Sequence, residues 1–115
     1  MRQVVVLVTR EGLGQVQTED RSFGVEMFDR YLHALESRPV KPRAICFYTE
    51  GVRLVSSGSP VVMSLKLLEG MGVRVIACRT CLEKYGLLDD LVVGEPGTMN
   101  DIVALMDQAD SVVTV

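Results

Sequence analysis

The amino-acid sequence predicts one three-layer α/β domain, in which helices cover both faces of a mostly parallel, five-stranded sheet. The alternation of two kinds of segment supports this fold class. Short aliphatic runs alternate along the chain with longer segments whose apolar residues recur at helical spacing. This alternation indicates right-handed βαβ crossovers, which build parallel sheets. The chain has 115 residues, a length typical of a single domain, so we expect one domain over residues 1–115.

The predicted strands are short runs rich in valine, isoleucine and leucine. Continuous apolar runs of this kind are typical of strands that are buried on both faces of a sheet. One of them, VRVIA, ends directly before a cysteine, which places that cysteine at the carboxyl edge of the predicted sheet. The predicted strands are residues 4–8, 43–48, 73–77, 91–93 and 111–115.

Each predicted helix contains an apolar stripe at helical spacing. Ser59-Pro60 places a capping hydroxyl and a first-turn proline before the second stripe. Thr98–Asp101 and Thr80–Glu83 resemble capping boxes. The stripes are Val25, Phe28, Tyr31, Leu32 and Leu35; then Val61, Val62, Leu65 and Leu68; then Met99, Ile102, Val103 and Met106.

The composition excludes several functional classes. The formal net charge is −3 and no basic run is present, so we expect no nucleic-acid partner. The first apolar run is too short for a membrane span or a signal peptide, so we expect a cytoplasmic protein with no membrane partner. Three cysteines are too few, and odd in number, for a secreted disulfide framework. We therefore expect these cysteines to be reduced thiols.

The stretch IACRTCLEKYGL carries the candidate chemistry, because Cys78 and Cys81 stand where a strand ends and a helix begins. Ligands of parallel sheets bind at this edge. A structural zinc site needs four thiolate or imidazole ligands, and only Cys46 and His33 remain to complete one. We expect no metal there. Cys46 lies inside a predicted strand as a core residue, and His33 is assigned no role.

A reactive role for Cys78 and Cys81 is favoured over inert packing, because backbone N–H groups at a helix start stabilise a thiolate. Arg79 adds positive charge and Glu83 opposes it. Thioredoxin-like proteins also present such a pair, but on a mixed sheet facing a cis-proline loop. Here Pro96 lies in a Gly-Glu-Pro-Gly stretch that we interpret as a turn. The pair fits persulfide carriage as well as it fits dithiol exchange.

Other polar residues and glycines fall at predicted strand ends or loop tips around the cysteine pair. Gly12-Leu13-Gly14 matches part of a dinucleotide fingerprint, but Gln17 replaces its third glycine, so we interpret it as a tight turn that can help hold a small anion. Thr49 can also line the pocket, whereas Tyr85 is expected to pack the short helix against the sheet. The candidate pocket and anion-stabilising residues are Gly12, Tyr48, Glu50, Gly51, Arg79, Thr80 and Asn100.

Three stretches carry a family resemblance: FYTEGVRLVSSGSPV, LKLLEGMGVRVIACRTCLEKYGL and VGEPGTMNDIV. Their most specific parts are Cys81-Leu-x-x-Tyr85-Gly86-Leu87 and Val93-Gly94 followed by Asn100. Over most of its length the chain resembles the DsrE/DsrF-like sulfur-relay family. It is most similar to the DsrE-like domain of the branch called sulfurtransferase-like selenium metabolism protein YedF. The loop after the first strand, REGLGQVQTEDRSFG, is more charged than this family leads us to expect.

The resemblance implies a flavodoxin-like parallel sheet, symmetric homo-oligomers such as trimers or hexamers, and a cysteine that passes on sulfane sulfur without a metal or organic cofactor. Cys78 matches the cysteine that carries sulfur in the wider family, and Cys81 matches the second cysteine of the selenium-associated branch. Proteins of that branch usually carry an N-terminal TusA-like domain. Because this chain begins directly at its first predicted strand, we expect a TusA-like sulfur donor or acceptor to act in trans.

The leading hypothesis is a sulfur-relay protein, a sulfurtransferase in the broad sense, that carries sulfane sulfur as a cysteine persulfide. Cys78 attacks the donor as a thiolate, and Cys81 assists release or protects the site as a disulfide. Two alternatives stay open. One is an oligomeric small-ligand-binding or regulatory module with structural cysteines, and the other is a dithiol oxidoreductase.

Overall fold

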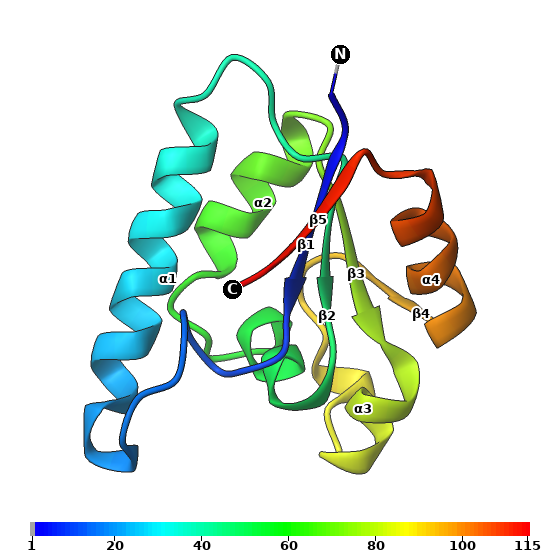
Figure 1. The fold of residues 1–115 in the computed structure, drawn as a ribbon. Coiled ribbons are helices and arrows are strands. Elements are labelled where there is room, and N and C mark those ends of the chain that lie inside the picture. Colours follow the sequence, from blue (N-terminus) through cyan, green and yellow to red (C-terminus); the bar gives the residue numbers. More distant parts are fainter. Residues whose placement is uncertain (1) are drawn as a thin grey trace.

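The computed structural model describes residues 2–115, which form a 5-stranded sheet with helices on both faces (Figure 1). Every pair of neighbouring strands is parallel, in the order β4-β3-β2-β1-β5. The predicted fold class is therefore confirmed. The strands are β1 (Val4–Val8), β2 (Ala44–Phe47), β3 (Arg74–Cys78), β4 (Glu95–Gly97) and β5 (Ser111–Thr114). The α-helices are α1 (Arg21–Glu36), α2 (Val62–Gly70), α3 (Arg79–Lys84) and α4 (Met99–Gln108). Short 3-10 helices are η1 (Thr18–Asp20), η2 (Thr49–Val55) and η3 (Leu88–Asp90).

Two apolar clusters lie on opposite faces of the sheet. The larger cluster contains Val6 of β1, with Phe28 of α1, Leu65 of α2 and Leu82 of α3. The smaller cluster contains Val5 of β1 together with residues of α4. Successive residues of β1 divide between the clusters because side chains alternate across a strand. Burial on both faces explains why the central strands are continuous apolar runs in the sequence.

The path of the chain changes direction after β4. From β1 to β3 each connection returns over the face that α1 and α2 cover, and α3 also packs on that face. After β4, helix α4 crosses the opposite face and brings the chain back to β5, beside β1 (Figure 1). Open parallel sheets bind ligands beyond the carboxyl ends of their strands. Cys78 lies at this end of β3, paired in register with Gly97 of β4.

The fourth strand lies further along the chain than residues 91–93, so this prediction is wrong. Leu91 makes only an isolated antiparallel bridge, and Val93 is buried in the larger cluster. Gly94, with φ 78°, then turns the chain, and a Cβ at this position would lie 2.6 Å from Cγ1 of Val75. The turn and the close approach to β3 both require glycine. Pairing with β3 therefore begins only at Glu95.

Pro96 consequently lies in β4 and not in a turn, which corrects a second prediction. β4 is an edge strand, and proline is tolerated at a sheet edge because one side of the strand needs no ladder hydrogen bond. The strand was not recognised in the sequence, because Glu-Pro-Gly has no alternation of apolar and polar residues and no β-branched residue.

The helix caps agree with the sequence in part. Thr98 and Asp101 form the expected capping box at the start of α4. The expected box at Thr80–Glu83 is absent, because α3 already begins at Arg79 and its N-cap is Cys78. Before α2, the Ser59 hydroxyl accepts the N–H of Val61 at 3.3 Å.

The apolar stripe of α4 also differs from the prediction. Its buried residues are Ile102 and Leu105, whereas Met99 and Val103 are 46% and 42% exposed. The difference corresponds to a small rotation of the helix about its axis. The spacing of apolar residues in the sequence does not determine this rotation. Two apolar side chains that were expected in the core therefore lie on the surface.

Candidate functional site

Cys78 and Cys81 lie beside each other at the carboxyl edge of the sheet and differ in exposure. Cys78 ends β3 and is buried, with 4% of its surface exposed, in the cluster beneath α4. Cys81 lies in the first turn of α3, is half-buried and packs against both apolar clusters. Both are free thiols. The sequence-based expectation that the pair lies at this edge is met, with Cys81 as the more accessible thiol.

Thr49 supplies a hydrogen bond to this pair from the neighbouring strand end. Its backbone N–H donates to Sγ of Cys81 at 3.1 Å. Thr49 has φ 50°, the one positive value at a non-glycine position in residues 2–115. This conformation is unfavourable for a β-branched residue and occurs where surrounding contacts impose it. Here the Thr49 hydroxyl donates to the carbonyl oxygen of Thr9 at 2.7 Å, which fixes the residue against the end of β1.

Gly51 explains how this segment can lie so close to β1. The residue is buried, and a Cβ at its position would collide with the carbonyl oxygen of Val8. The backbone of η2 thus packs directly against the end of β1. This contact holds Thr49 between the carboxyl ends of β1 and β2, next to the start of α3.

Two of the three cysteines have a raised pKa. Burial, followed by the neighbouring Cys78 thiol, raises the pKa of Cys81, although the N–H of Thr49 acts in the opposite direction. Arg79 and Glu83, whose opposite charges were expected to have opposing effects on the thiols, are both exposed. Burial raises the pKa of Cys46 to about 11, and that thiol is fully buried inside β2. Cys46 is therefore inert at neutral pH, as the sequence indicates.

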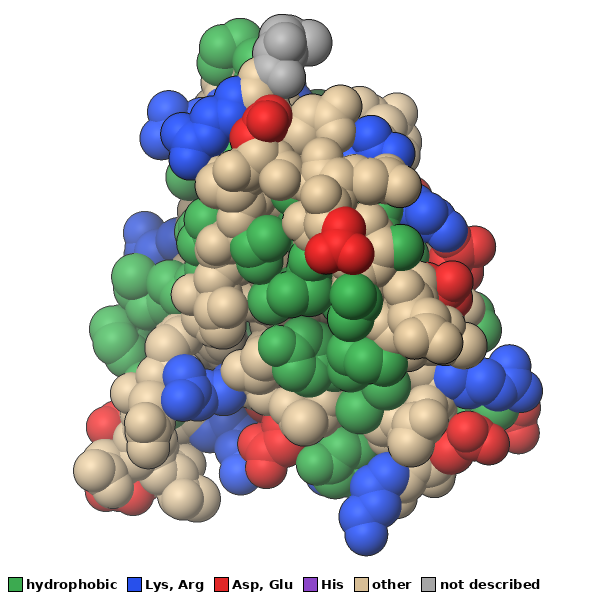
Figure 2. Space-filling model, turned by 45° about the vertical axis from the view of Figure 1, so that its right-hand side comes forward, with side chains coloured by type: hydrophobic (Ala, Val, Ile, Leu, Met, Phe, Trp, Pro, Cys, Tyr) green, Lys and Arg blue, Asp and Glu red, His purple; other side chains and the backbone are tan. Residues whose placement is uncertain are grey.

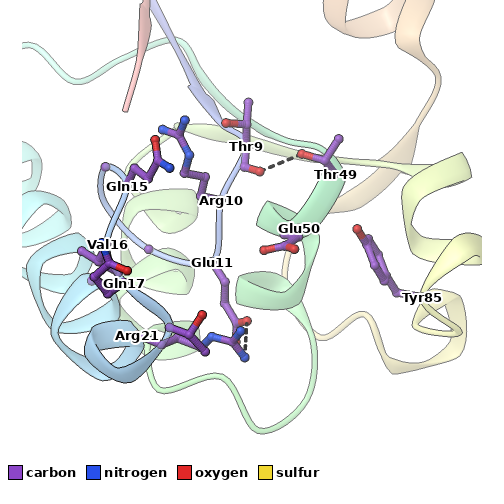
Figure 3. Close-up of a pocket in the computed structure, with 14 residues that line it drawn as sticks. Thr9, Arg10, Glu11, Gln15, Val16, Gln17, Arg21, Thr49, Glu50 and Tyr85 are labelled. Atoms are coloured by element: carbon purple, nitrogen blue, oxygen red, sulfur yellow. Dashed lines mark hydrogen bonds and ion pairs between the residues drawn. The ribbon is translucent and has the colours of Figure 1, made fainter.

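A polar cavity of about 530 Å³ borders Thr49 (Figure 3). It is enclosed by the loop after β1, the start of α1, the start of η2 and the side chain of Tyr85. Tyr85 lies one helical turn after Cys81, and its N–H donates to the Cys81 carbonyl oxygen at 3.2 Å. The lining residues are Thr9, Arg10, Glu11, Gly12, Gly14, Gln15, Val16, Gln17, Thr18, Arg21, Gly24, Thr49, Glu50 and Tyr85.

The predicted pocket residues divide between the cavity and its surroundings. Gly12 and Glu50 line the cavity, Gly51 is buried and does not line it, and Tyr48 packs against the cluster that contains Cys78. Arg79 and Thr80 are exposed at the start of α3. Asn100 is exposed on α4 and does not line the cavity.

Neither Arg10 nor Arg21 was predicted as a site residue, although both line the cavity. The available signal was the unusual charge of the loop after the first strand, at the edge where ligands bind. Tyr85 packs against the larger cluster as expected. In addition it borders the cavity, and the Arg53 guanidinium lies 4.5 Å from the centre of its ring.

The remaining titratable groups contribute little to this site. His33 is exposed on α1, where its ring nitrogens lie 3.4 Å from Asp29 and 3.6 Å from Glu36.

Within residues 2–115, no cluster of three or more His, Cys, Asp or Glu side chains could hold a metal ion. In the same part of the chain, no helix has both the length and the apolar character needed to cross a bilayer.

Comparison with known proteins identifies the family. The sequence profile of the DsrE/DsrF-like family matches residues 4–115. The chain belongs to the DsrE/DsrF-like family. No curated protein matches this DsrE-like chain. Membership supports a sulfur-relay function at the level of the family.

Solved structures share the DsrE-like fold at low sequence identity. The ychN protein from E. coli is 18% identical, with a TM-score of 0.73 and full coverage of both chains. MTH1491 from Methanobacterium thermoautotrophicum, a protein of unknown function, is 17% identical, with a TM-score of 0.70 and the same coverage. BT1422 from Bacteroides thetaiotaomicron, also of unknown function, is 14% identical, with a TM-score of 0.64 over 98% of this chain and 95% of its own. At these identities the likeness shows the fold.

Proposed function

We propose that this DsrE-like protein carries sulfane sulfur as a persulfide on the Cys78–Cys81 pair. The observation that supports this proposal best is the hydrogen bond from the Thr49 N–H to Sγ of Cys81, beside a second free thiol at the carboxyl edge of the sheet. A persulfide carrier requires an accessible thiol and a donor that steadies the terminal sulfur or the thiolate. The strained backbone of Thr49 supplies such a donor.

Cys81 receives the sulfur first in this proposal. The sequence-based hypothesis gave that role to Cys78, but Cys78 is buried and Cys81 is the more exposed thiol. The Cys81 thiolate attacks the outer sulfur of a donor persulfide. The sulfur–sulfur bond of the donor breaks as the new bond to Sγ of Cys81 forms, and the donor leaves as a thiolate that takes up a proton. No net oxidation occurs.

Release of the sulfur follows one of two routes. An acceptor thiolate attacks the outer sulfur and regenerates the Cys81 thiol. Alternatively, the Cys78 thiolate attacks Sγ of Cys81, expels hydrosulfide and leaves a Cys78–Cys81 disulfide, which an external thiol then reduces. The buried position of Cys78 directly behind Cys81 suits the second attack, because the donor does not reach Cys78 first.

The partners of this relay are a TusA-like protein acting in trans and further copies of the same chain, in a trimer or hexamer. Hydrophobic side chains gather in the centre of the face that includes α4 and the β5 edge (Figure 2). Val103 of α4 and Val112 of β5 are 42% and 39% exposed. An exposed apolar area of this kind is typical of a protein interface. Three free thiols suit the reducing cytoplasm, where we place the relay.

Intact-protein mass spectrometry after incubation with inorganic polysulfide tests the proposal. We expect the wild type and Cys46→Ala, the matched control, to gain one sulfur atom that a reducing agent removes. Cys81→Ser is expected to abolish the gain, whereas Cys78→Ser is expected to keep and prolong it, because hydrosulfide can no longer be expelled.

Other outcomes distinguish the alternatives. Loss of two hydrogens in the wild type, together with no gain of sulfur in Cys78→Ser, indicates a dithiol oxidoreductase. An unchanged mass in the wild type contradicts the relay and leaves a binding module with structural cysteines. A gain that only Cys78→Ser removes returns the receiving role to Cys78.

A further inference from the structure

The cavity beside Cys81 carries charges of both signs on different walls. Arg10 extends from the loop after β1, and Glu50 extends from the start of η2 (Figure 3). Within residues 2–115, neither side chain has a salt-bridge partner, whereas Glu11 and Arg21 lie 3.8 Å apart as a pair. The cavity therefore offers one cation and one anion that the protein itself does not neutralise.

This arrangement matches a ligand with a carboxylate and an ammonium group. A guanidinium binds a carboxylate through parallel hydrogen bonds, and a carboxylate accepts from an ammonium group. The side chains of Gln15 and Gln17 add uncharged donors and acceptors to the lining. A volume of about 530 Å³ falls in the range of small-molecule sites and suits an amino acid or short peptide.

The cavity and the cysteine pair share one wall. Thr49 lines the cavity, and its N–H donates to Sγ of Cys81. Tyr85 also borders the cavity from the helix that carries Cys81. A ligand held by Arg10 and Glu50 therefore lies next to two residues that contact Cys81.

We propose that this cavity binds the donor, a low-molecular-weight thiol of the amino-acid or short-peptide class, and that its persulfide delivers sulfur to Cys81. The inference rests on the proposed relay function and adds the substrate class. One sulfur atom passes from the donor persulfide to the Cys81 thiol. One sulfur–sulfur bond breaks and one forms, and the reduced small thiol leaves the cavity with the proton that Cys81 gave up.

Transfer kinetics with two donors test this inference. Glutathione persulfide carries carboxylate and ammonium groups, whereas inorganic polysulfide carries neither. We expect Arg10→Gln and Glu50→Gln each to raise the concentration of glutathione persulfide needed for the half-maximal rate about tenfold, the effect of losing one charge-assisted hydrogen bond. The concentration of inorganic polysulfide needed for the half-maximal rate is expected to change much less, because polysulfide has neither group for Arg10 and Glu50 to bind. Lys66→Gln and Glu69→Gln, exposed on α2 away from the cavity, are the matched controls.

The two failures can be separated. If sulfur transfers from both donors and the cavity variants behave like the α2 controls, the donor inference is wrong while the relay stands. If neither donor adds sulfur to the wild type, the relay itself is wrong. Binding of reduced glutathione, followed by amide shifts in NMR spectra, gives a readout that needs no transfer. We expect shifts at residues 9–18 and 49–50 that Arg10→Gln weakens, and shifts confined elsewhere would overturn the inference.

Discussion

Thr49 shows how a single residue can define this site. It adopts a backbone conformation that costs on the order of 1–3 kcal/mol for a residue other than glycine. Its hydroxyl is fixed on Thr9, and its N–H faces Sγ of Cys81. The strained residue is therefore the same one that donates a hydrogen bond to Cys81, the half-exposed cysteine. Nothing in the sequence around Thr49 indicates a positive φ, so this feature could not be predicted.

The pH dependence of Cys81 follows from its surroundings at the same scale. Because burial and the Cys78 thiol raise its pKa, we expect alkylation of Cys81 by iodoacetamide at pH 7 to be slower than that of free cysteine. The rate should rise with pH through and beyond the ordinary pKa of a thiol. Cys78→Ala removes one of the causes and should shift the profile to lower pH.

Mass-spectrometric alkylation kinetics between about pH 6 and 10 provide the measurement, a range that brackets the usual thiol pKa. Cys46→Ala serves as the control, since Cys46 is not among the causes of the shift. If Cys78→Ala and Cys46→Ala give the same profile, then the two thiols of the site do not interact as described.

At the scale of elements, the contact between η2 and β1 positions Thr49, and Gly51 makes this contact possible. We expect Gly51→Ala to destabilise the fold by about 1–3 kcal/mol, because the new Cβ must displace backbone. Gly70→Ala is the matched control, since a Cβ there has no neighbour within 4 Å and alanine is favoured in a helix. Urea unfolding measures both variants.

The outcome for Gly51 also bears on the site. A stable Gly51→Ala protein with unchanged Cys81 alkylation would contradict the view that this contact positions Thr49. If Gly70→Ala loses as much stability as Gly51→Ala, the effect at Gly51 is not specific.

The elements also show what periodicity predicts well and where it fails. β1, β2 and β3 were predicted within a residue or two, because strands buried on both faces must be apolar throughout. The edge strand β4 was missed, since Glu-Pro-Gly pairs on one side only and carries no apolar signal. The cavity was predicted at Gly12, Gly14, Thr49 and Glu50. Its other charged residues lie in an irregular loop whose path is determined by tertiary contacts.

At the scale of the whole molecule, the edge strand β5 provides a candidate contact surface for the proposed oligomer. Val112 and Val113 are 39% and 40% exposed on an edge strand, yet they face opposite sides of the sheet. Val112 pairs with Val5, of the cluster beneath α4, and Val113 pairs with Val6, of the larger cluster. Exposed apolar edge strands are a liability unless another chain covers them. The face that α4 shares with Val112 is therefore the better candidate interface.

These two valines allow a matched test of the assembly. We expect the wild type to elute as an oligomer in size-exclusion chromatography with light scattering, and Val112→Lys to dissociate it, because a buried lysine charge opposes association. Val113→Lys places the same charge at equal exposure on the opposite face and should leave the oligomer intact. Dissociation by Val113→Lys alone would assign the interface to the α1 face. A monomeric wild type would contradict the assembly, and the cysteine chemistry would then have to be complete within one chain, as the contact between Thr49 and Cys81 allows.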